Sequence, residues 1–157
     1  MTRRELREHV FRSLFGADFY RSGSDADEQL DLYFIHEGGD GVDYPPSAVP
    51  EEEREEVKER IRHVWEKQEE IDRMIDAVSI GWTTDRMSRA DLAILRLGAY
   101  ELLFDESVPP GVAINEAVLL AKKFGGEESS SFINGILGKL QRENADGPGA
   151  PKEDEGK

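Results

Sequence analysis

The chain has 157 residues, of which 38% are hydrophobic and 34% charged, and its formal net charge is −14. This length predicts one domain, or two small subdomains with a shared core, and the composition favours amphipathic helices with disordered ends. There is no cysteine, which excludes a disulfide framework and a thiolate metal site. No apolar run approaches the roughly 18 residues that span a bilayer, so we expect a cytoplasmic protein with no membrane partner.

The negative charge is unevenly distributed. Residues 36–56 contain eight acidic residues and one arginine, and residues 143–157 contain five acidic and two basic residues. Residues 1–12 have the opposite sign, with four arginines and two glutamates. A basic end on an acidic protein directs a polyanion to one place while the remaining surface repels it.

The first predicted helix starts at a capping-box pattern formed by Thr2 and Glu5. Its apolar face follows at helical spacing: Leu6, Val10, Phe11, Leu14 and Phe15. A second helix is expected from Ser24 and Asp25, with an apolar face of Leu30, Tyr33 and Phe34. Residues 36–50 are rich in glycine and proline and are expected to form an acidic flexible loop.

Arginines extend the apolar face of the first helix. A helical wheel at 100° per residue places three arginines on the same side as this apolar face, near its N-terminal end: Arg3, Arg4 and Arg7. Arg12 points away from this face and is expected to be an ordinary surface residue. Arginines in a first turn oppose the helix dipole unless an anion is present. Two interpretations therefore stay open, a frayed basic start and a contact site for phosphates or bases.

A long central helix is predicted after Pro50. Apolar residues recur at alternating steps of four and three, with one glutamine among them: Val57, Ile61, Val64, Gln68, Ile71, Ile75 and Val78. We expect this helix to pack within the chain and to break near Gln68, and a two-chain coiled coil is the rival interpretation. Gly81 and Trp82 end it, with Trp82 expected as an aromatic that packs at a hinge.

The next predicted helix opens at a capping pattern of Ser88 and Asp91. Its apolar residues are Leu92, Leu95, Ala99, Leu102 and Leu103. For Asp91 we consider two roles, a partner of the helix dipole in the first turn and a contact to another molecule.

Two further helices are predicted between Pro109 and Leu140. The first has a broad apolar face and ends at Gly125 and Gly126, which are expected to form a left-handed stop; its face comprises Val112, Ile114, Asn115, Ala117, Val118, Leu119 and Ala121. Glu128 and the serines from Ser129 to Ser131 offer caps for the second helix. Its inner face comprises Phe132, Ile133, Ile136, Leu137 and Leu140. Residues 143–157 are expected to be a disordered acidic tail.

The predicted architecture is therefore all-α, and no catalytic constellation stands out. His9, His36 and His63 are isolated in sequence, and no nucleophile elbow or dinucleotide-binding glycine motif is present. Carboxylates are abundant but lie on predicted solvated faces. We expect a binding protein that is not an enzyme and that has no metal site or cofactor.

The sequence of the last helical hairpin resembles the sequences of the NusB family of bacterial transcription antitermination factors. The matching elements are a proline before V-A-I-N-E-A, the A-K-K-F-G helix end, the serine-led corner, and F-I-N-G-I-L. The helix from Asp91 to Leu102 (DLAILRLGAYEL) matches as well, so the resemblance runs from about residue 82 to 140, with a weaker echo at the N-terminus.

This resemblance implies a bundle of about seven helices in two small packed subdomains, with residues 1–142 as the binding domain. It implies that the chain binds the boxA element of ribosomal RNA leaders together with the ribosomal protein NusE, on the elongating RNA polymerase complex. The RNA-contact positions that it implies are Arg3, Arg4, Arg7, Phe15, Ser129 and Phe132. Asp91 and Glu128 match acidic positions that face the protein partner.

Two features depart from the family pattern. Glu5 stands where some relatives have another arginine, and the segment 36–56 is longer and more acidic than expected. Two alternative functions stay open. One is a targeting module like that of ribosomal RNA cytosine methyltransferases, and the other is a structural helical protein that self-associates, for example as a weak homodimer.

Overall fold

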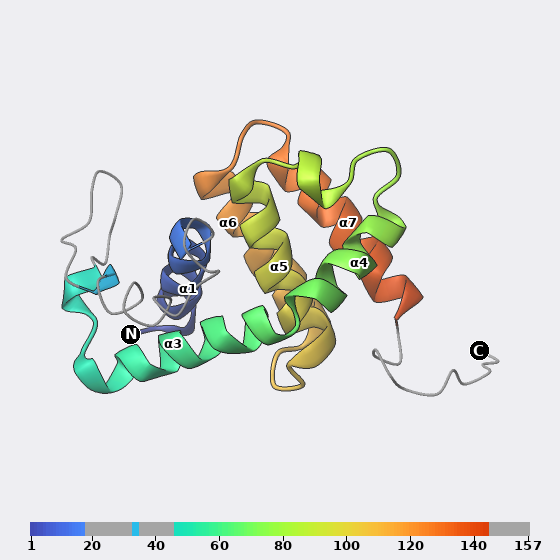
Figure 1. Ribbon diagram of the computed structural model, residues 1–157. Helices are drawn as coiled ribbons and strands as arrows, with labels where there is room; N and C mark the ends of the chain where they lie inside the picture. The colour runs from blue at the N-terminus through green and yellow to red at the C-terminus, as the bar shows by residue number, and fades with distance from the viewer. Residues whose placement is uncertain (18–32, 35–45, 145–157) are drawn as a thin grey trace. The chain divides into compact units, whose positions relative to one another are not determined.

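The computed structural model describes residues 1–17, 33–34 and 46–144, and every regular element among them is helical (Figure 1). Contacts divide the chain into two compact units, Met1–Glu66 (unit 1) and Lys67–Lys157 (unit 2). In chain order the elements are α1 (Arg3–Ala17), the 3-10 helix η1 (Pro46–Ala48), α3 (Glu51–Glu66), α4 (Gln68–Val78), η2 (Thr84–Arg86), α5 (Arg89–Phe104), α6 (Pro110–Phe124) and α7 (Ser129–Glu143).

The all-α prediction is confirmed. Six of the roughly seven expected helices lie in the described residues, and the helix expected from Ser24 lies outside them, except for Tyr33 and Phe34. Most of the acidic tail, residues 145–157, also lies outside them. No helix in the described parts of the chain has the length and apolar character needed to cross a membrane.

In unit 1, α1 packs against α3. The predicted apolar face of α1 is buried apart from Phe15, which is 39% exposed. Within the described part of the unit, the buried hydrophobic residues are Leu6, Val10, Phe11, Leu14, Phe34, Val49, Val57, Ile61 and Val64. At the end of the expected loop, Val49 is 1% exposed, and its carbonyl oxygen accepts a hydrogen bond from Nε of Arg54 at 2.9 Å. Residues 35–45 of that loop lie outside the described residues.

The central helix is broken where its pattern predicts. α3 ends at Glu66 and α4 begins at Gln68, so the break falls at Lys67. All seven residues of the predicted seam, from Val57 to Val78, are buried, including Gln68 at 6% exposure.

In unit 2, α5, α6 and α7 pack against one another, and α4 contacts α5 and α7. Gly98 lies where the three longer helices meet. A Cβ added to Gly98 would lie 3.0 Å from Leu137 Cδ1 and 3.2 Å from Ala117 Cβ. Glycine at this position therefore allows α5 to approach both α6 and α7 closely.

The predicted inner face of α6 was wrong in part. Val112 is 42% exposed and Asn115 is exposed. The residues that α6 buries are Ala113, Glu116, Ala117, Leu120 and Ala121. Because α6 is apolar around most of its circumference, hydrophobicity alone does not identify the inner side. The side that packs has mostly small residues, which suits the close approach at Gly98.

Candidate RNA and partner interface

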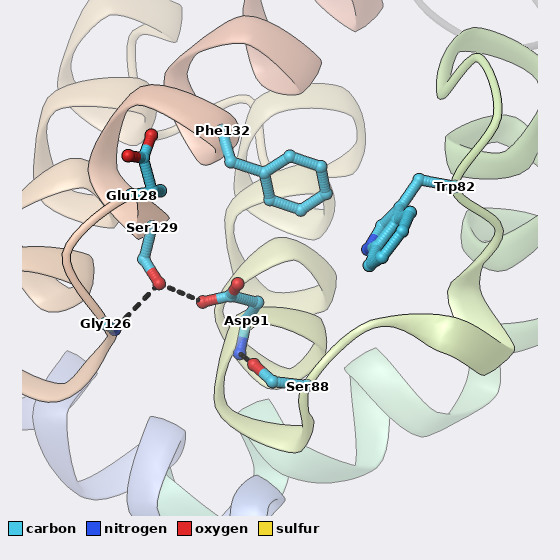
Figure 2. A pocket seen from close by; sticks show the side chains of 7 residues that line it. All are labelled: Trp82, Ser88, Asp91, Gly126, Glu128, Ser129 and Phe132. Atoms are coloured by element: carbon cyan, nitrogen blue, oxygen red, sulfur yellow. Dashed lines mark hydrogen bonds between the residues drawn. The ribbon is translucent and has the colours of Figure 1, made fainter.

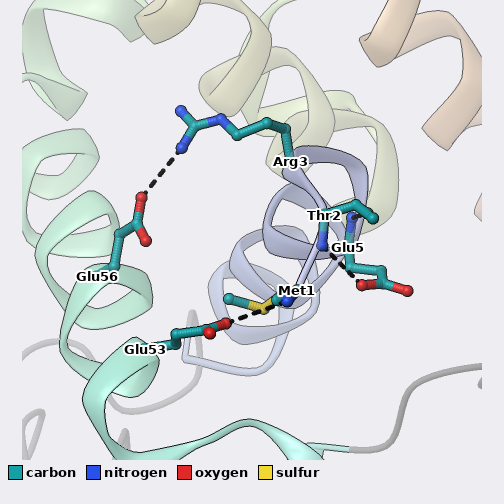
Figure 3. A network of polar contacts seen from close by, with 6 residues as sticks. All are labelled: Met1, Thr2, Arg3, Glu5, Glu53 and Glu56. Atoms are coloured by element: carbon teal, nitrogen blue, oxygen red, sulfur yellow. Dashed lines mark hydrogen bonds and ion pairs between the residues drawn. The ribbon is translucent and has the colours of Figure 1, made fainter.

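The first turn of α1 is closed by the predicted capping box. The amide of Thr2 donates to Glu5 Oε1 at 2.8 Å, and the amide of Glu5 donates to Thr2 Oγ1 at 3.0 Å (Figure 3). These reciprocal bonds satisfy two amides that a helix start leaves without partners. They fix the start of the helix, and with it the backbone positions of Arg3 and Arg4, whose side chains are exposed.

Acidic residues of α3 lie beside this basic end. Nη1 of Arg3 is 3.1 Å from Glu56 Oε2, and the Met1 ammonium is 3.4 Å from Glu53 Oε1 (Figure 3). The side chains of Arg3 and Glu56 are 58% and 49% exposed. An ion pair this exposed contributes at most about 1 kcal/mol. A phosphate group can therefore replace Glu56 at Arg3 at little cost.

Arg7 differs from the other two predicted arginines. It is 8% exposed, so most of its side chain is buried and away from an open surface. The reason is its place on the helix, because Arg7 lies one turn before Val10 and Phe11 on the same side of α1. Phe15, by contrast, is partly exposed, and its ring stacks on Phe11 with centroids 6.1 Å apart.

A polar cluster that the sequence pattern missed lies on another side of α1. His9 Nδ1 and the Tyr33 hydroxyl are hydrogen bonded at 2.6 Å, and the Arg12 guanidinium lies over the Tyr33 ring, 5.8 Å from its centroid. Burial lowers the pKa of His9 to about 4, helped by the charge of Arg12 and opposed by that of Glu5. His9 is therefore neutral at pH 7. The prediction that Arg12 is an ordinary surface residue was wrong.

In unit 2, one serine connects the starts of two helices. Ser88 Oγ caps α5 by accepting from the Asp91 amide at 3.1 Å, as predicted. The hydroxyl of Ser129 donates to Asp91 Oδ1 at 2.7 Å and accepts from the Gly126 amide at 2.9 Å (Figure 2). Ser129 is only 6% exposed. This geometry gives Ser129 a structural role, and its predicted RNA contact stays a prediction.

The corner before α7 differs from the expected left-handed stop. Gly125 has φ −95° and ψ −174°, which is extended backbone, and Gly81 is the one described residue with a clearly positive φ, at 77°. A Cβ on Gly125 would lie 2.6 Å from both Cβ and Oγ of Ser129. Glycine is needed here because Ser129 approaches the backbone, and not because of a left-handed conformation.

An open pocket of about 420 Å³ lies beside this corner. Its lining contains Trp82, Ser88, Asp91, Gly126, Glu128, Ser129 and Phe132 (Figure 2). It therefore brings together two residues predicted for RNA, Ser129 and Phe132, and the two predicted for the protein partner, Asp91 and Glu128. The other predicted RNA residues, which are Arg3, Arg4, Arg7 and Phe15, belong to unit 1.

Trp82 is the lining residue that sequence reasoning placed wrongly. It is 46% exposed, so it does not pack as a buried hinge residue. One signal was available in the sequence: Trp82 lies in the turn between two helices, outside every apolar face. Among the described residues, no group of three or more histidine or acidic side chains is arranged to hold a metal ion.

A model of the NusB family matches residues 4–142. The chain belongs to the NusB family. A transcription antitermination protein NusB from Lachnoclostridium phytofermentans is 45% identical over 140 residues, which cover 89% of this chain and 98% of that protein. These findings confirm the resemblance seen in the motifs, and with it the class of transcription antitermination proteins.

Solved structures of NusB proteins share the fold. The structure of T. maritima NusB is 34% identical, with a TM-score of 0.75, and the match covers 91% of this chain and 92% of that one. A crystal structure of antitermination factors NusB and NusE in complex with dsRNA gives a TM-score of 0.68 at 24% identity, over 90% of this chain and 96% of that one. At that identity the second comparison shows the fold alone.

Proposed function

We propose that this chain binds the boxA element of ribosomal RNA leaders together with the ribosomal protein NusE, and that it acts with elongating RNA polymerase in the cytoplasm. The observation that carries the proposal is the family match over residues 4–142. That span supports residues 1–142 as the binding domain, followed by an acidic tail. The proposed role is binding, without a catalytic step.

The proposed RNA surface is the start of α1. Arg3 and Arg4 are exposed there, and the Arg3 ion pair with Glu56 is weak enough for a phosphate to replace it. Phe15, on the last turn of α1, offers a partly exposed ring for base stacking. Arg7 is buried, so we assign it a contribution to the positive potential of this end in place of a direct contact.

The proposed NusE surface includes Asp91 and Glu128 at the pocket of unit 2. Phe132, on the first turn of α7, is half-buried and lines the same pocket. The predicted RNA contacts of Phe132 and Ser129 would therefore adjoin the protein contacts. This proximity agrees with joint binding of RNA and NusE.

Fluorescence anisotropy with a labelled boxA RNA tests the proposal. Arg4→Ala should weaken binding and reduce the slope of log K against log salt by about 1, because one phosphate contact is lost. Arg73→Ala is the matched control, since Arg73 is an exposed arginine of α4 in unit 2. NusE should strengthen RNA binding by every variant. Equal affinities and slopes for the two variants would remove Arg4 from the RNA site. Sedimentation over a dilution series tests the predicted weak homodimer.

A further inference from the structure

Trp82 is held in an exposed position by its own turn. The Ser79 hydroxyl donates to the Trp82 carbonyl oxygen at 2.5 Å, and Asp76 Oδ1 accepts from the Thr84 amide at 2.7 Å. Gly81 supplies the positive φ that this turn requires. A pinned turn that presents a large aromatic ring is an ordered binding element, because little conformational entropy is lost when a ligand contacts the ring.

The pocket beside Trp82 combines aromatic rings with negative charge. Figure 2 shows Trp82 and Phe132 at the pocket together with the carboxylate of Asp91. The described lining contains two carboxylates, Asp91 and Glu128, and no basic side chain. Oδ1 of Asp91 accepts from Ser129, whereas Oδ2 has no partner among the residues that the structure describes. Glu128 is exposed at the N-cap position of α7 and makes no side-chain cap bond.

Arg86 contacts Trp82 but does not line the pocket. Its guanidinium lies over the Trp82 ring, 5.5 Å from its centroid. A cation inside the pocket would meet aromatic faces and carboxylates together, which is the arrangement that binds ammonium and guanidinium groups well. An RNA phosphate there would be repelled by both carboxylates.

We propose that this pocket receives one basic side chain, a lysine or an arginine, of the protein partner, and that Trp82 forms one of its walls. The inference rests on the proposed function, and it identifies the chemistry by which the partner is recognised. The carboxylate of Asp91 pairs with the cation, and the rings of Trp82 and Phe132 flank it. In this arrangement Phe132 contacts the protein partner in place of the RNA contact proposed for it above. Trp82 thereby joins the partner interface, to which neither the motifs nor the family comparison assigned it.

Binding of purified NusE to variants of the full chain, measured by calorimetry, is the first test. Trp82→Ala should weaken binding about tenfold, since it removes a cation–π wall. Asp91→Asn keeps an oxygen for the Ser129 hydroxyl and removes the charge, so it should weaken binding by a similar factor and lower its salt dependence. Ile80→Ala is the matched control, because Ile80 is 88% exposed in the same turn and does not line the pocket.

Fluorescence of Trp82 identifies the occupant. The chain has two tryptophans, so Trp65→Phe leaves Trp82 as the single indole emitter. Its emission should change when NusE is added and stay constant with boxA RNA alone. A response to RNA alone would show that a base occupies the pocket, and no response to either would show that the pocket is not a contact site; both results overturn the inference.

Failure of this inference and failure of the proposed function are distinguishable. If the unsubstituted chain binds neither NusE nor boxA RNA, the proposed function is wrong. If it binds NusE and the Trp82→Ala and Asp91→Asn variants bind equally well, only the pocket assignment is wrong. Thermal unfolding of each variant separates a lost contact from a lost fold.

Discussion

Replacing Ser129 with alanine should destabilise unit 2 by about 2 kcal/mol. The substitution removes the hydroxyl that donates to Asp91 at 2.7 Å and accepts from the Gly126 amide at 2.9 Å. A hydrogen bond to a charged group contributes about 1.5–3 kcal/mol, and the half-exposed Asp91 recovers part of that from water. Gly126 is exposed, so water replaces its lost bond almost completely. The bond to Asp91 therefore accounts for most of the expected loss.

Urea denaturation followed by circular dichroism measures this loss. The midpoint should fall with an unchanged m-value, because the surface exposed on unfolding stays the same. The midpoint temperature should fall by roughly 4–8 °C, since about 1 kcal/mol shifts it by 2–4 °C in a chain of this size. Ser131→Ala is the matched control, because Ser131 is exposed in the same turn of α7, and it should change the unfolding free energy by less than about 0.5 kcal/mol.

Two outcomes would refute the structural role of Ser129. Equal stability of the Ser129→Ala and Ser131→Ala variants would show that the bond to Asp91 contributes nothing net. Unchanged stability combined with weaker boxA binding would show that Ser129 contacts RNA directly, as the family resemblance implies.

Three further predictions concern buried groups and glycines. Because burial depresses the pKa of His9 to about 4, the unfolded chain binds a proton between pH 6.5 and 4 that the folded chain does not. His9 therefore lowers the unfolding free energy by up to about 3 kcal/mol as the pH falls through this range, and His9→Gln should remove this part of the pH dependence in urea titrations. Gly125→Ala should destabilise the chain by about 1–3 kcal/mol, because the added Cβ would lie 2.6 Å from Ser129. Gly135→Ala should instead stabilise α7 by up to about 1 kcal/mol, because nothing described lies within 4 Å of the added Cβ. Changes of the same sign in the unfolding free energies of the two variants would contradict this reasoning. Arg96→Lys should cost about 1 kcal/mol in thermal unfolding, since lysine cannot reproduce the two bonds of 3.0 and 2.8 Å to the carboxylate of Asp72, and an unchanged transition would show that this pair is neutral.

Local sequence patterns correctly predicted the features that depend only on residues close to one another in the sequence. The Thr2 and Ser88 caps form as expected, because each needs only side chains within one turn. The buried seam of α3 and α4 follows from a single narrow apolar stripe, and the break falls next to Gln68, the one polar residue in that stripe. The inner face of α7 was likewise predicted, with Ile133, Ile136, Leu137 and Leu140 buried and Phe132 half-buried.

Predictions failed where the burial, conformation or contacts of a residue depend on another helix or segment. α6 is apolar on several sides, and the side that packs is chosen by α5 and α7, so Val112 is exposed and Ala113 is buried. Gly125 was interpreted as a left-handed stop, although its need for glycine comes from the side chain of Ser129 four residues later. Arg12 lies over the ring of Tyr33, a residue 21 positions away, which no helical wheel of α1 includes.

The sequence by itself determined the helical architecture, the capped starts of α1 and α5, and the family, because these depend on neighbours along the chain and on short sequence motifs in a few helices. Tertiary structure alone decided which predicted residues share a surface. It buries Arg7 and Ser129, exposes Trp82, and brings Asp91 and Phe132 to one pocket although 41 positions separate them. The physical reason is that burial and proximity depend on how helices pack, and packing is set by side chains on several helices at once.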